Sequence, residues 1–434
     1  MASKLFDRLN IEEQLVLYSL ALTYPVYLLG GLYVLGSVIG WLLLFIFCFK
    51  IYLIGLKPGE IHPLVRVSPV VWLWVLGMLG MLVALLVAHV DRQLGTGLTI
   101  KSSIGWAKGW ALLALFPLLG CILNIRPEVL VRGCVIAAAS AIPFAALGIL
   151  MSVAGLSGDL FLSPLKAIGG PTELFQVKMY GINPETGMAR WQFTGPWAPA
   201  AGLLSCFYLL ICLQEKALRW RIAGVGGSLV MCLLCQSRAG WAIFIVIVPI
   251  MVGLSQLRNP FTWVVLGLAL PTLFLLGEPL FHWLMETYEQ VKESRPGSTR
   301  VRSTLARLAV QRWEAEAPIW GHGVVERGPK IVEHMPIGTH HSWYGLLFVK
   351  GIVGLFSLAL PLALTCLYLL LLAQKSPMAK VSLGICVVIV SYSFFENLEI
   401  LAYIYWPALL WVGVSLSPRA LAYDRIKSLH EGNV

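Results

Sequence analysis

The feature that most constrains this chain is its succession of apolar runs, most of them about 17–25 residues long, the length of a membrane-spanning helix. Charged residues make up only 12% of the 434 residues, whereas soluble domains carry about 25%. Strands of a membrane β-barrel would instead alternate apolar and polar residues over about ten positions. The sequence therefore predicts an all-α polytopic integral membrane protein.

The apolar runs predict about 12 transmembrane helices. They lie near residues 13–30, 33–55, 70–90, 104–123, 130–154, 197–214, 221–236, 239–257, 260–279, 342–373, 379–395 and 399–416. With this layout, segments on the side of the N-terminus carry about twice as many Lys and Arg residues as the short segments opposite, which favours cytoplasmic termini. The net charge of +10 is then explained by the membrane topology, and no nucleic-acid partner is expected.

The spans divide the chain into four regions. Residues 1–279 hold transmembrane helices 1–9, together with an external loop at about 155–196. Residues 280–341 form one large, partly helical external loop between spans 9 and 10. Residues 342–416 hold helices 10–12, and residues 417–434 form a cytoplasmic tail.

The large external loop contains a predicted amphipathic helix. Ser298 or Thr299 can cap a helix that runs to about Glu316, before a proline. Val301, Leu305, Leu308, Ala309 and Trp313 fall on one broad face of it. Arg300 and Arg307 lie on the opposite face, whereas Arg302 and Arg312 lie within or at the edge of the apolar arc. A buried arginine needs an acceptor or anion, although these side chains could also extend to water or lipid head groups.

A histidine pair closes this loop. His340 and His341 stand directly before the apolar run that begins at Ser342. An imidazole with a pKa near its ordinary value of about 6.5 can act as a base at neutral pH. Neighbouring residues of a helix point about 100° apart, so only one of the two histidines can readily face a common site. The spacing to Tyr344 favours His341, and His340 remains the rival.

Other ionisable residues occur at the same predicted side of the membrane. Arg190 precedes span six, and Arg238 lies between spans seven and eight. With Arg302 they come from three distant segments, and arginine forks match the oxygens of a pyrophosphate. Glu396, in the turn between the last two spans, could orient a histidine, pair with an arginine or simply be solvated.

Four motifs together resemble the bacterial O-antigen ligase family, within the superfamily of O-antigen ligases and polymerases. They are His341-Ser342 followed by Leu347, Gly351 and Gly354; Ser237-Arg238 before a small residue; Arg190 before Gly195-Pro196; and Pro318-x-x-Gly321-x-Gly323. Each motif is short, but their order and shared side extend the resemblance over essentially the whole chain. The loop arginine is the weakest match, because Arg300, Arg302 and Arg307 all qualify.

The resemblance implies transfer of O-antigen polysaccharide from undecaprenyl pyrophosphate to the lipid A–core oligosaccharide at the periplasmic face of the bacterial inner membrane. His341 would be the general base, with Glu396 as a second catalytic residue. The expected substrate-binding residues are Arg190, Arg238, Arg302, Arg300, Tyr344 and His340. No metal or cofactor is expected, since the external segments lack an Asp-x-Asp pair. Besides the two lipid-linked glycans, the expected partners are the surrounding membrane lipids.

Three other functions remain open at this stage. An O-antigen polymerase would use the same donor but a second lipid-linked glycan as acceptor. A protein O-oligosaccharyltransferase would be expected to carry more sequence after the last span. A transporter of lipid-linked saccharides would need charged residues along the spans, which hold few of them.

Overall fold

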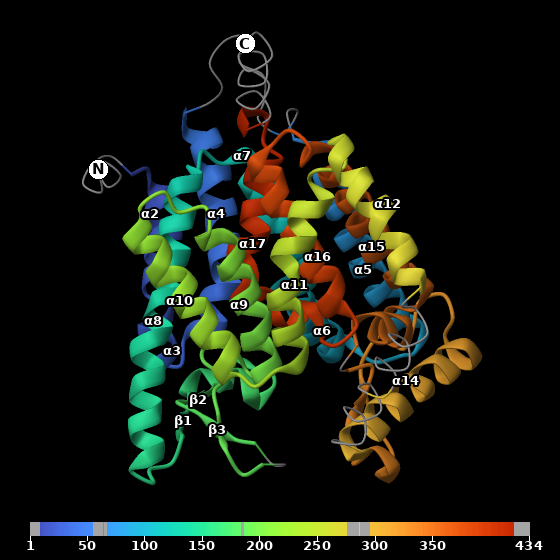
Figure 1. Cartoon of the computed structure of the whole chain (residues 1–434). Coiled ribbons are helices and arrows are strands. Elements are labelled where there is room, and N and C mark those ends of the chain that lie inside the picture. Colours follow the sequence, from blue (N-terminus) through green and yellow to red (C-terminus); the bar gives the residue numbers. More distant parts are fainter. Residues whose placement is uncertain are drawn as a thin grey trace.

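The computed structural model describes residues 9–54, 64, 67–183, 186–275, 286, 296–339 and 341–420, and most of these are helical (Figure 1). Along the chain the helices are α2 (Ile11–Ala21), α3 (Thr23–Leu28), α4 (Leu32–Ile54), α5 (Pro69–Asp91), α6 (Thr96–Lys108), α7 (Trp110–Ile122), α8 (Pro127–Val153), α9 (Ala198–Cys212), α10 (Leu218–Leu234), α11 (Arg238–Leu254), α12 (Pro260–Leu275), α14 (Pro296–Glu316), α15 (Ser342–Leu372), α16 (Pro377–Ser393) and α17 (Leu398–Ser415).

Six helical segments of the described chain are long and apolar enough to cross a membrane. They are Leu32–Leu53, Pro69–Asp91, Thr96–Ile122, Pro127–Val153, Ser342–Leu372 and Leu398–Ser415. Four shorter apolar helices occupy further predicted spans: Ala198–Cys212, Arg238–Leu254, Pro260–Ala269 and Pro377–Ser393. The coarse prediction of an α-helical protein with multiple membrane-length helices is therefore confirmed.

Two predicted spans are broken into helix pairs. The first is interrupted at Leu22, between α2 and α3, and the fourth at Gly109, between α6 and α7. The sequence placed the fourth span at 104–123, but α6 already begins at Thr96. Hydropathy missed this start because α6 is comparatively polar and none of its residues is buried.

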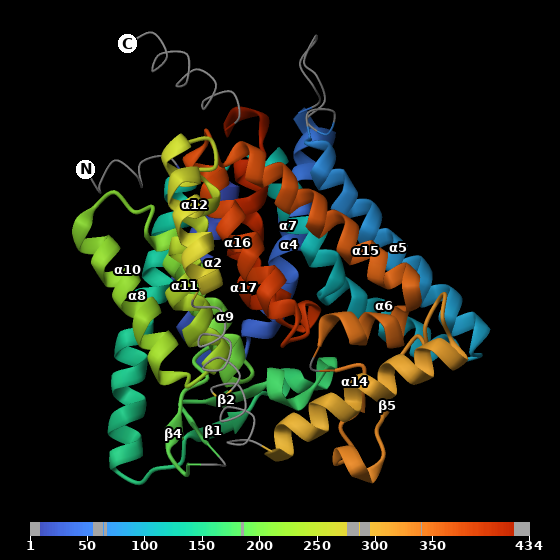
Figure 2. The same cartoon turned by 45° about the vertical axis from the view of Figure 1, so that its right-hand side comes forward.

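The centre of the bundle is α17, which packs against α4, α7, α9 and α16 (Figure 2). Helix α15 runs beside α5 and α16. Helix α2 begins and α17 ends at the upper end of the bundle in Figure 1, whereas α14 and the strands lie at the lower end. The segments that carry the predicted site therefore lie at one end of the bundle, opposite the start of α2 and the end of α17.

The loops contain strands that the all-α prediction did not include. The 155–196 segment forms two hairpins, β1 (Asp159–Leu162) with β2 (Gln176–Lys178) and β3 (Gly181–Ile182) with β4 (Ala189–Arg190). The large loop adds β5 (Glu326–Arg327) with β6 (Pro336–Ile337). These strands are only two to four residues long, and the alternation needed to detect a strand is absent from such short segments.

Helix α15 is broken at Gly351, where φ is 62° and ψ is −161°. The segment Pro318–Gly323 inserts at this break and supplies partners for backbone groups that the break separates, as buried backbone requires. The exchanged bonds are His322 N to Phe348 O (2.8 Å), Gly323 N to Val349 O (2.9 Å), Ile352 N to Pro318 O (3.0 Å) and Val353 N to Ile319 O (3.3 Å). Two sequence motifs, far apart in the chain, thus form one structural unit.

Only glycine fits at this junction. A Cβ atom on Gly351 would lie 2.2 Å from the carbonyl oxygen of Ile319, and one on Gly321 would lie 2.5 Å from the backbone nitrogen of Gly351. Both glycines also have positive φ, a region that is strained for other residues. The break turns the first part of α15, which carries the histidine motif, away from the axis of the rest of the helix.

Candidate active site

His341 is the N-cap of α15, with φ −163° and ψ 115°. Its ring nitrogen Nδ1 accepts a hydrogen bond from the backbone N–H of Tyr344 at 3.4 Å, and the side chain is half-buried. Because Nδ1 is the acceptor, a neutral ring in this conformation carries its proton on Nε2. The bond is long and therefore weak, so exchange to the other tautomer requires little loss of interaction.

The histidine end of α15 is joined to the turn between α16 and α17. The backbone N–H of His341 donates to Oδ1 of Asn397 at 3.1 Å. The hydroxyl of Ser342 donates to the backbone carbonyl of Glu396 at 2.6 Å. Ser342, Glu396 and Asn397 are all at least nine-tenths buried. These contacts fix the backbone of His341 relative to the carboxylate of Glu396.

Aromatic rings surround the imidazole of His341. The ring of Tyr344 packs on it with centroids 4.1 Å apart, and Phe394 approaches it edge-on at 5.8 Å and 85°. Burial by these neighbours lowers the pKa of His341 below its ordinary value of about 6.5. Burial therefore favours the neutral ring, the state that a general base requires.

Glu396 is buried, with 3% of its surface exposed, so the solvated alternative for this residue is wrong. Its Oε2 accepts a hydrogen bond from Nε1 of Trp197 at 2.8 Å. Burial raises the pKa of Glu396 to about 7, while the positive charge of Arg302 and the bond from Trp197 act in the opposite direction. The carboxylate therefore interacts with Trp197 and Arg302, and the bond that holds His341 comes from the neighbouring Asn397.

Helix α14 brings Arg302 to this place. The helix buries Val301, Leu305 and Ala309 in a small core with Phe348 of α15, as the predicted amphipathic pattern requires. It begins at Pro296, before the predicted caps Ser298 and Thr299, and ends at Glu316 as predicted. Arg302 and Arg300 are both exposed. The expectation that Arg302 points into the packed face is therefore wrong, since it lies outside the small core and its charge acts on Glu396.

Arg312 is the arginine of α14 that lies against the packed face. Its guanidinium contacts the carboxylates of Glu316 at 2.7 Å and Glu326 at 2.6 Å and lies 5.3 Å from the ring centroid of Phe348. His322 also contacts Glu316, through Nε2 at 2.9 Å. These partners give Arg312 and His322 a structural role that joins α14 to the break in α15.

Arg190 and Arg238 meet at the turn between α10 and α11. Arg190 lies in β4, and its Nε and Nη2 donate to the carbonyls of Cys235 (2.8 Å) and Gln236 (3.1 Å). Arg238 is the exposed first residue of α11. The structure therefore brings these two arginines together, and it also gives Arg190 a structural task, because its guanidinium holds the 155–196 loop to this turn.

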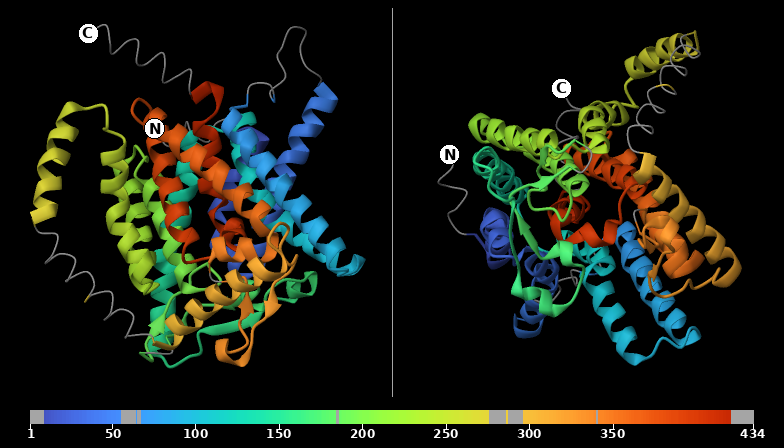
Figure 3. Two further views of the ribbon diagram at one scale, coloured as in Figure 1. Left: turned by 90° about the vertical axis from the view of Figure 1, so that its right-hand side faces the viewer. Right: turned by 90° about the horizontal axis from the view of Figure 1, so that it is seen from below.

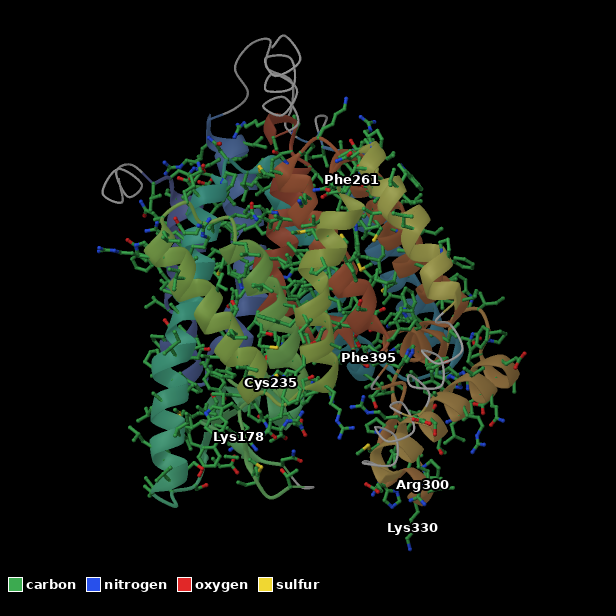
Figure 4. All side chains as sticks on the ribbon, in the orientation of Figure 1. Lys178, Cys235, Phe261, Arg300, Lys330 and Phe395 are labelled. Atoms are coloured by element: carbon green, nitrogen blue, oxygen red, sulfur yellow. The ribbon has the colours of Figure 1, made fainter. Side chains whose placement is uncertain are left out.

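The arginine-bearing segments lie on two sides of the turn between α16 and α17. In Figure 4, Phe395 of the α16–α17 turn appears between Cys235, at the end of α10, and Arg300 on α14. The view from below in Figure 3 likewise places α14 on one side of the α16–α17 region and the strands of the 155–196 loop on the other. The turn thus lies between the segments that carry the predicted arginines. His340 lies outside the described residues.

Sequence reasoning missed a buried polar group next to this turn. Lys350, in the last turn of α15 before the break, is 4% exposed, and its charge interacts with Glu399 at the start of α17. Atom Oε2 of Glu399 is buried and accepts no hydrogen bond within the described part of the chain. Asn397 was missed as well, although an amide directly after Glu396 in a short turn could have marked it.

The site offers a base and cations rather than an evident metal centre. Within the described ranges, no three His, Cys, Asp or Glu side chains gather in a way that could hold a metal ion. No protein-family model matches the chain, and no curated protein matches it. The geometry of the described residues must therefore carry any functional argument.

Proposed function

We propose that this chain is a membrane glycosyltransferase that joins O-antigen polysaccharide from undecaprenyl pyrophosphate to the lipid A–core oligosaccharide. The observation that carries the proposal is the position of His341, a neutral histidine held at the end of a membrane-length helix beside a buried carboxylate. That carboxylate, Glu396, interacts with Arg302 from a different segment. A base near a carboxylate that interacts with a cation, at the end of a membrane-length helix, suits a reaction between two lipid-anchored glycans.

The reaction is a direct displacement at the anomeric carbon of the donor. The acceptor hydroxyl loses its proton to Nε2 of His341 as its oxygen bonds to the anomeric carbon. The bond from that carbon to the phosphate oxygen breaks, and undecaprenyl pyrophosphate leaves with the electron pair. Proton uptake at Nε2 uses the tautomer protonated at Nδ1, so the 3.4 Å bond from Tyr344 is given up.

The arginines stabilise the charge that develops on the leaving pyrophosphate. Arg302 and Arg300 approach from α14, and Arg238 from the start of α11. Arg190 holds the loop beside Arg238 through its bonds to Cys235 and Gln236. In this scheme Glu396 orients Arg302, and Asn397 orients His341. No step requires a metal.

The same proposal assigns the topology. The chain crosses the bacterial inner membrane about 12 times, with both termini in the cytoplasm and the site on the periplasmic face. Helix pairs and the shorter apolar helices supply the spans beyond the six long ones. The position of α14 and the loop strands at one end of the bundle agrees with this arrangement (Figure 1).

Two alternatives share part of this support. An O-antigen polymerase would use the same base and arginines with a lipid-linked glycan as acceptor. A transporter of lipid-linked saccharide is disfavoured, because the charged groups used here lie at one end of the bundle instead of along its length.

A reconstituted transfer assay tests the proposal. The purified protein is mixed with undecaprenyl-pyrophosphate-linked glycan and a lipid A–core acceptor, with EDTA present. We expect product from the wild type and from His334→Ala, a control at an exposed loop histidine, and none from folded His341→Ala. Full activity of His341→Ala would reject the assigned base. Elongation of the lipid-linked glycan without use of the core would favour polymerase activity. Absence of any transfer would reject the proposed glycosyltransferase activity.

A further inference from the structure

Two adjacent phenylalanines on the α16–α17 turn are exposed at the point where the candidate residues converge. Phe394 and Phe395 are 51% and 44% exposed, although Glu396 and Asn397, which follow directly, are buried. Figure 4 places Phe395 on the lower side of the α16–α17 region. Large apolar side chains exposed together indicate a surface that binds something.

We propose that Phe394 and Phe395 form a stacking platform for a pyranose ring of the acceptor saccharide. The proposal rests on the proposed glycosyl transfer. The ring centroid of Phe394 lies 5.8 Å from that of His341, at an interplanar angle of 85°. An acceptor hydroxyl must come within about 3 Å of His341 to lose its proton. A sugar ring that carries such a hydroxyl is wide enough to lie over this phenylalanine at the same time.

The chemistry of an aromatic face suits this ligand. The face of a phenylalanine ring carries partial negative charge, and the axial C–H groups of a pyranose carry partial positive charge. Stacking covers the apolar face of the sugar while its equatorial hydroxyls stay available for hydrogen bonds. The platform thus holds the ring and leaves the reacting hydroxyl free to point at His341.

The surroundings argue for a saccharide over a lipid chain. Phe261 on α12, which lies at the opposite end of the bundle in Figure 4, is 69% exposed on an apolar helix and suits contact with lipid tails. The platform instead adjoins His341, Glu396 and Asn397. A hydrocarbon chain placed there would remove the half-buried imidazole of His341 from water without replacing its hydrogen bonds.

The acceptor, and not the donor sugar, is the ligand assigned to the platform. In the displacement the base contacts the attacking hydroxyl, while the donor is held through its pyrophosphate by arginines. Those arginines lie on α14 and at the α10–α11 turn, whereas Phe394 contacts the ring of the base itself. Loss of the platform should therefore weaken acceptor binding and leave donor binding unchanged.

Steady-state transfer assays with varied lipid A–core acceptor test the platform. We expect Phe395→Ala and Phe395→Leu to raise KM for the acceptor about tenfold, with little change in kcat or in KM for the donor, because an aromatic contact is lost. Phe395→Trp should retain the wild-type acceptor KM, and Phe261→Ala is the matched control. Phe395→Leu keeps apolar bulk, so its effect separates loss of the aromatic face from misfolding. Phe394→Leu, at the ring that packs against His341, should raise the acceptor KM in the same way. Unchanged acceptor KM in folded Phe394→Leu and folded Phe395→Leu overturns the platform.

Binding of a lipid-free core oligosaccharide, followed by saturation-transfer difference NMR, separates this inference from the proposed function. Wild-type binding that is lost in Phe395→Leu supports the platform even if no transfer occurs, in which case only the reaction is rejected. Transfer by the wild type with equal binding by both proteins rejects the platform alone. Equal losses of donor and acceptor affinity would indicate a structural role and also overturn it.

Discussion

The backbone N–H of His341 donates to Oδ1 of Asn397 at 3.1 Å, so the cap of α15 is held by the turn before α17. The amide nitrogen of Asn397 in turn approaches Gly338 O and Oε1 of Glu399, each at 3.5 Å. These contacts fix which end of the amide faces His341. Asn397 is 5% exposed, so water does not easily replace it.

Replacement of Asn397 should therefore slow the reaction without weakening substrate binding. We expect Asn397→Ala to lower kcat by roughly 10- to 100-fold, because a displaced catalytic group loses its alignment. Asn397→Asp keeps an oxygen that can accept from His341 and should retain more activity. The measurement is kcat and both KM values in the reconstituted assay, with Asn259→Ala in a distant turn as control. Equal activity of all the variants would remove Asn397 from the positioning of the base.

The ionisation of Glu396 should govern activity near neutral pH. Burial raises the pKa of Glu396 to about 7, so the carboxylate that attracts Arg302 is lost as the pH falls through this value. Burial lowers the pKa of His341, so its protonation follows that of Glu396 as the pH falls. We expect kcat to fall below pH 7 in the wild type, whereas Glu396→Gln, which resembles the protonated state, should have a lower kcat throughout and lack this fall. Identical pH profiles would contradict this assignment.

Glu396 should affect the stability of the fold with a pH dependence opposite to its effect on activity. The folded protein binds a proton at Glu396 more tightly than the unfolded chain does, because its pKa is above the ordinary 4.5. The contribution of this group to stability is complete below the ordinary value and is lost as the pH rises through about 7. The melting temperature in detergent should decrease from pH 5.5 to pH 8, and less so in Glu396→Gln. An unchanged slope in the variant would exclude Glu396 as the source.

Substitution of Gly351 should disrupt the junction between α15 and the Pro318–Gly323 segment. Gly351→Ala places a methyl group 2.2 Å from Ile319 O at a positive φ. We expect the free energy of unfolding to decrease by at least about 2 kcal/mol, together with loss of transfer activity. Gly226→Ala, at a helix position with no atom within 4 Å of the added carbon, should be neutral or slightly stabilising. The melting temperatures of both variants are measured by circular dichroism. Equal melting temperatures would contradict the importance of Gly351 for the junction.

The buried pair of Lys350 and Glu399 should show energetic coupling. Lys350→Met leaves Glu399 without its nearby positive charge, and we expect stability to decrease by about 1 kcal/mol, because a buried carboxylate loses a favourable charge interaction. The double variant Lys350→Met/Glu399→Gln removes both charges and should be more stable than Lys350→Met. The stabilities of the wild type, the two single variants and the double variant form a double-mutant cycle, which is measured through their melting temperatures. Additive effects would show that the two charges do not stabilise each other.

Local patterns in the sequence were sufficient to predict most of the membrane-length helices. Apolar runs predicted the membrane-length helices, and the spacing of Val301, Leu305 and Ala309 predicted the buried face of α14. Both signals depend only on residues close together in the chain. The same reasoning failed at α6, whose polar composition hides a helix that ends at Lys108, just before α7 begins at Trp110.

The relation between the motifs depends on long-range contacts. The sequence contains Gly351 and the Pro318–Gly323 segment as separate motifs, and only the fold shows that they complete one set of backbone hydrogen bonds. Likewise, a glutamate in a short external turn is ordinarily solvated, and its spacing does not reveal burial. In the fold Glu396 is buried, with a hydrogen bond from Trp197 and a charge interaction with Arg302, both from distant parts of the chain.

By itself the sequence determined the helical class of this protein, the amphipathic loop helix and the candidate residues His341, Glu396 and Arg302. Those features follow from hydropathy, periodicity and residue chemistry, which are local properties. The tertiary structure decided that Arg302 acts on Glu396, that Asn397 holds His341, and that Arg190 bonds to the α10–α11 turn. Such pairings join segments that are far apart in the chain, so packing of the whole bundle is needed to create them.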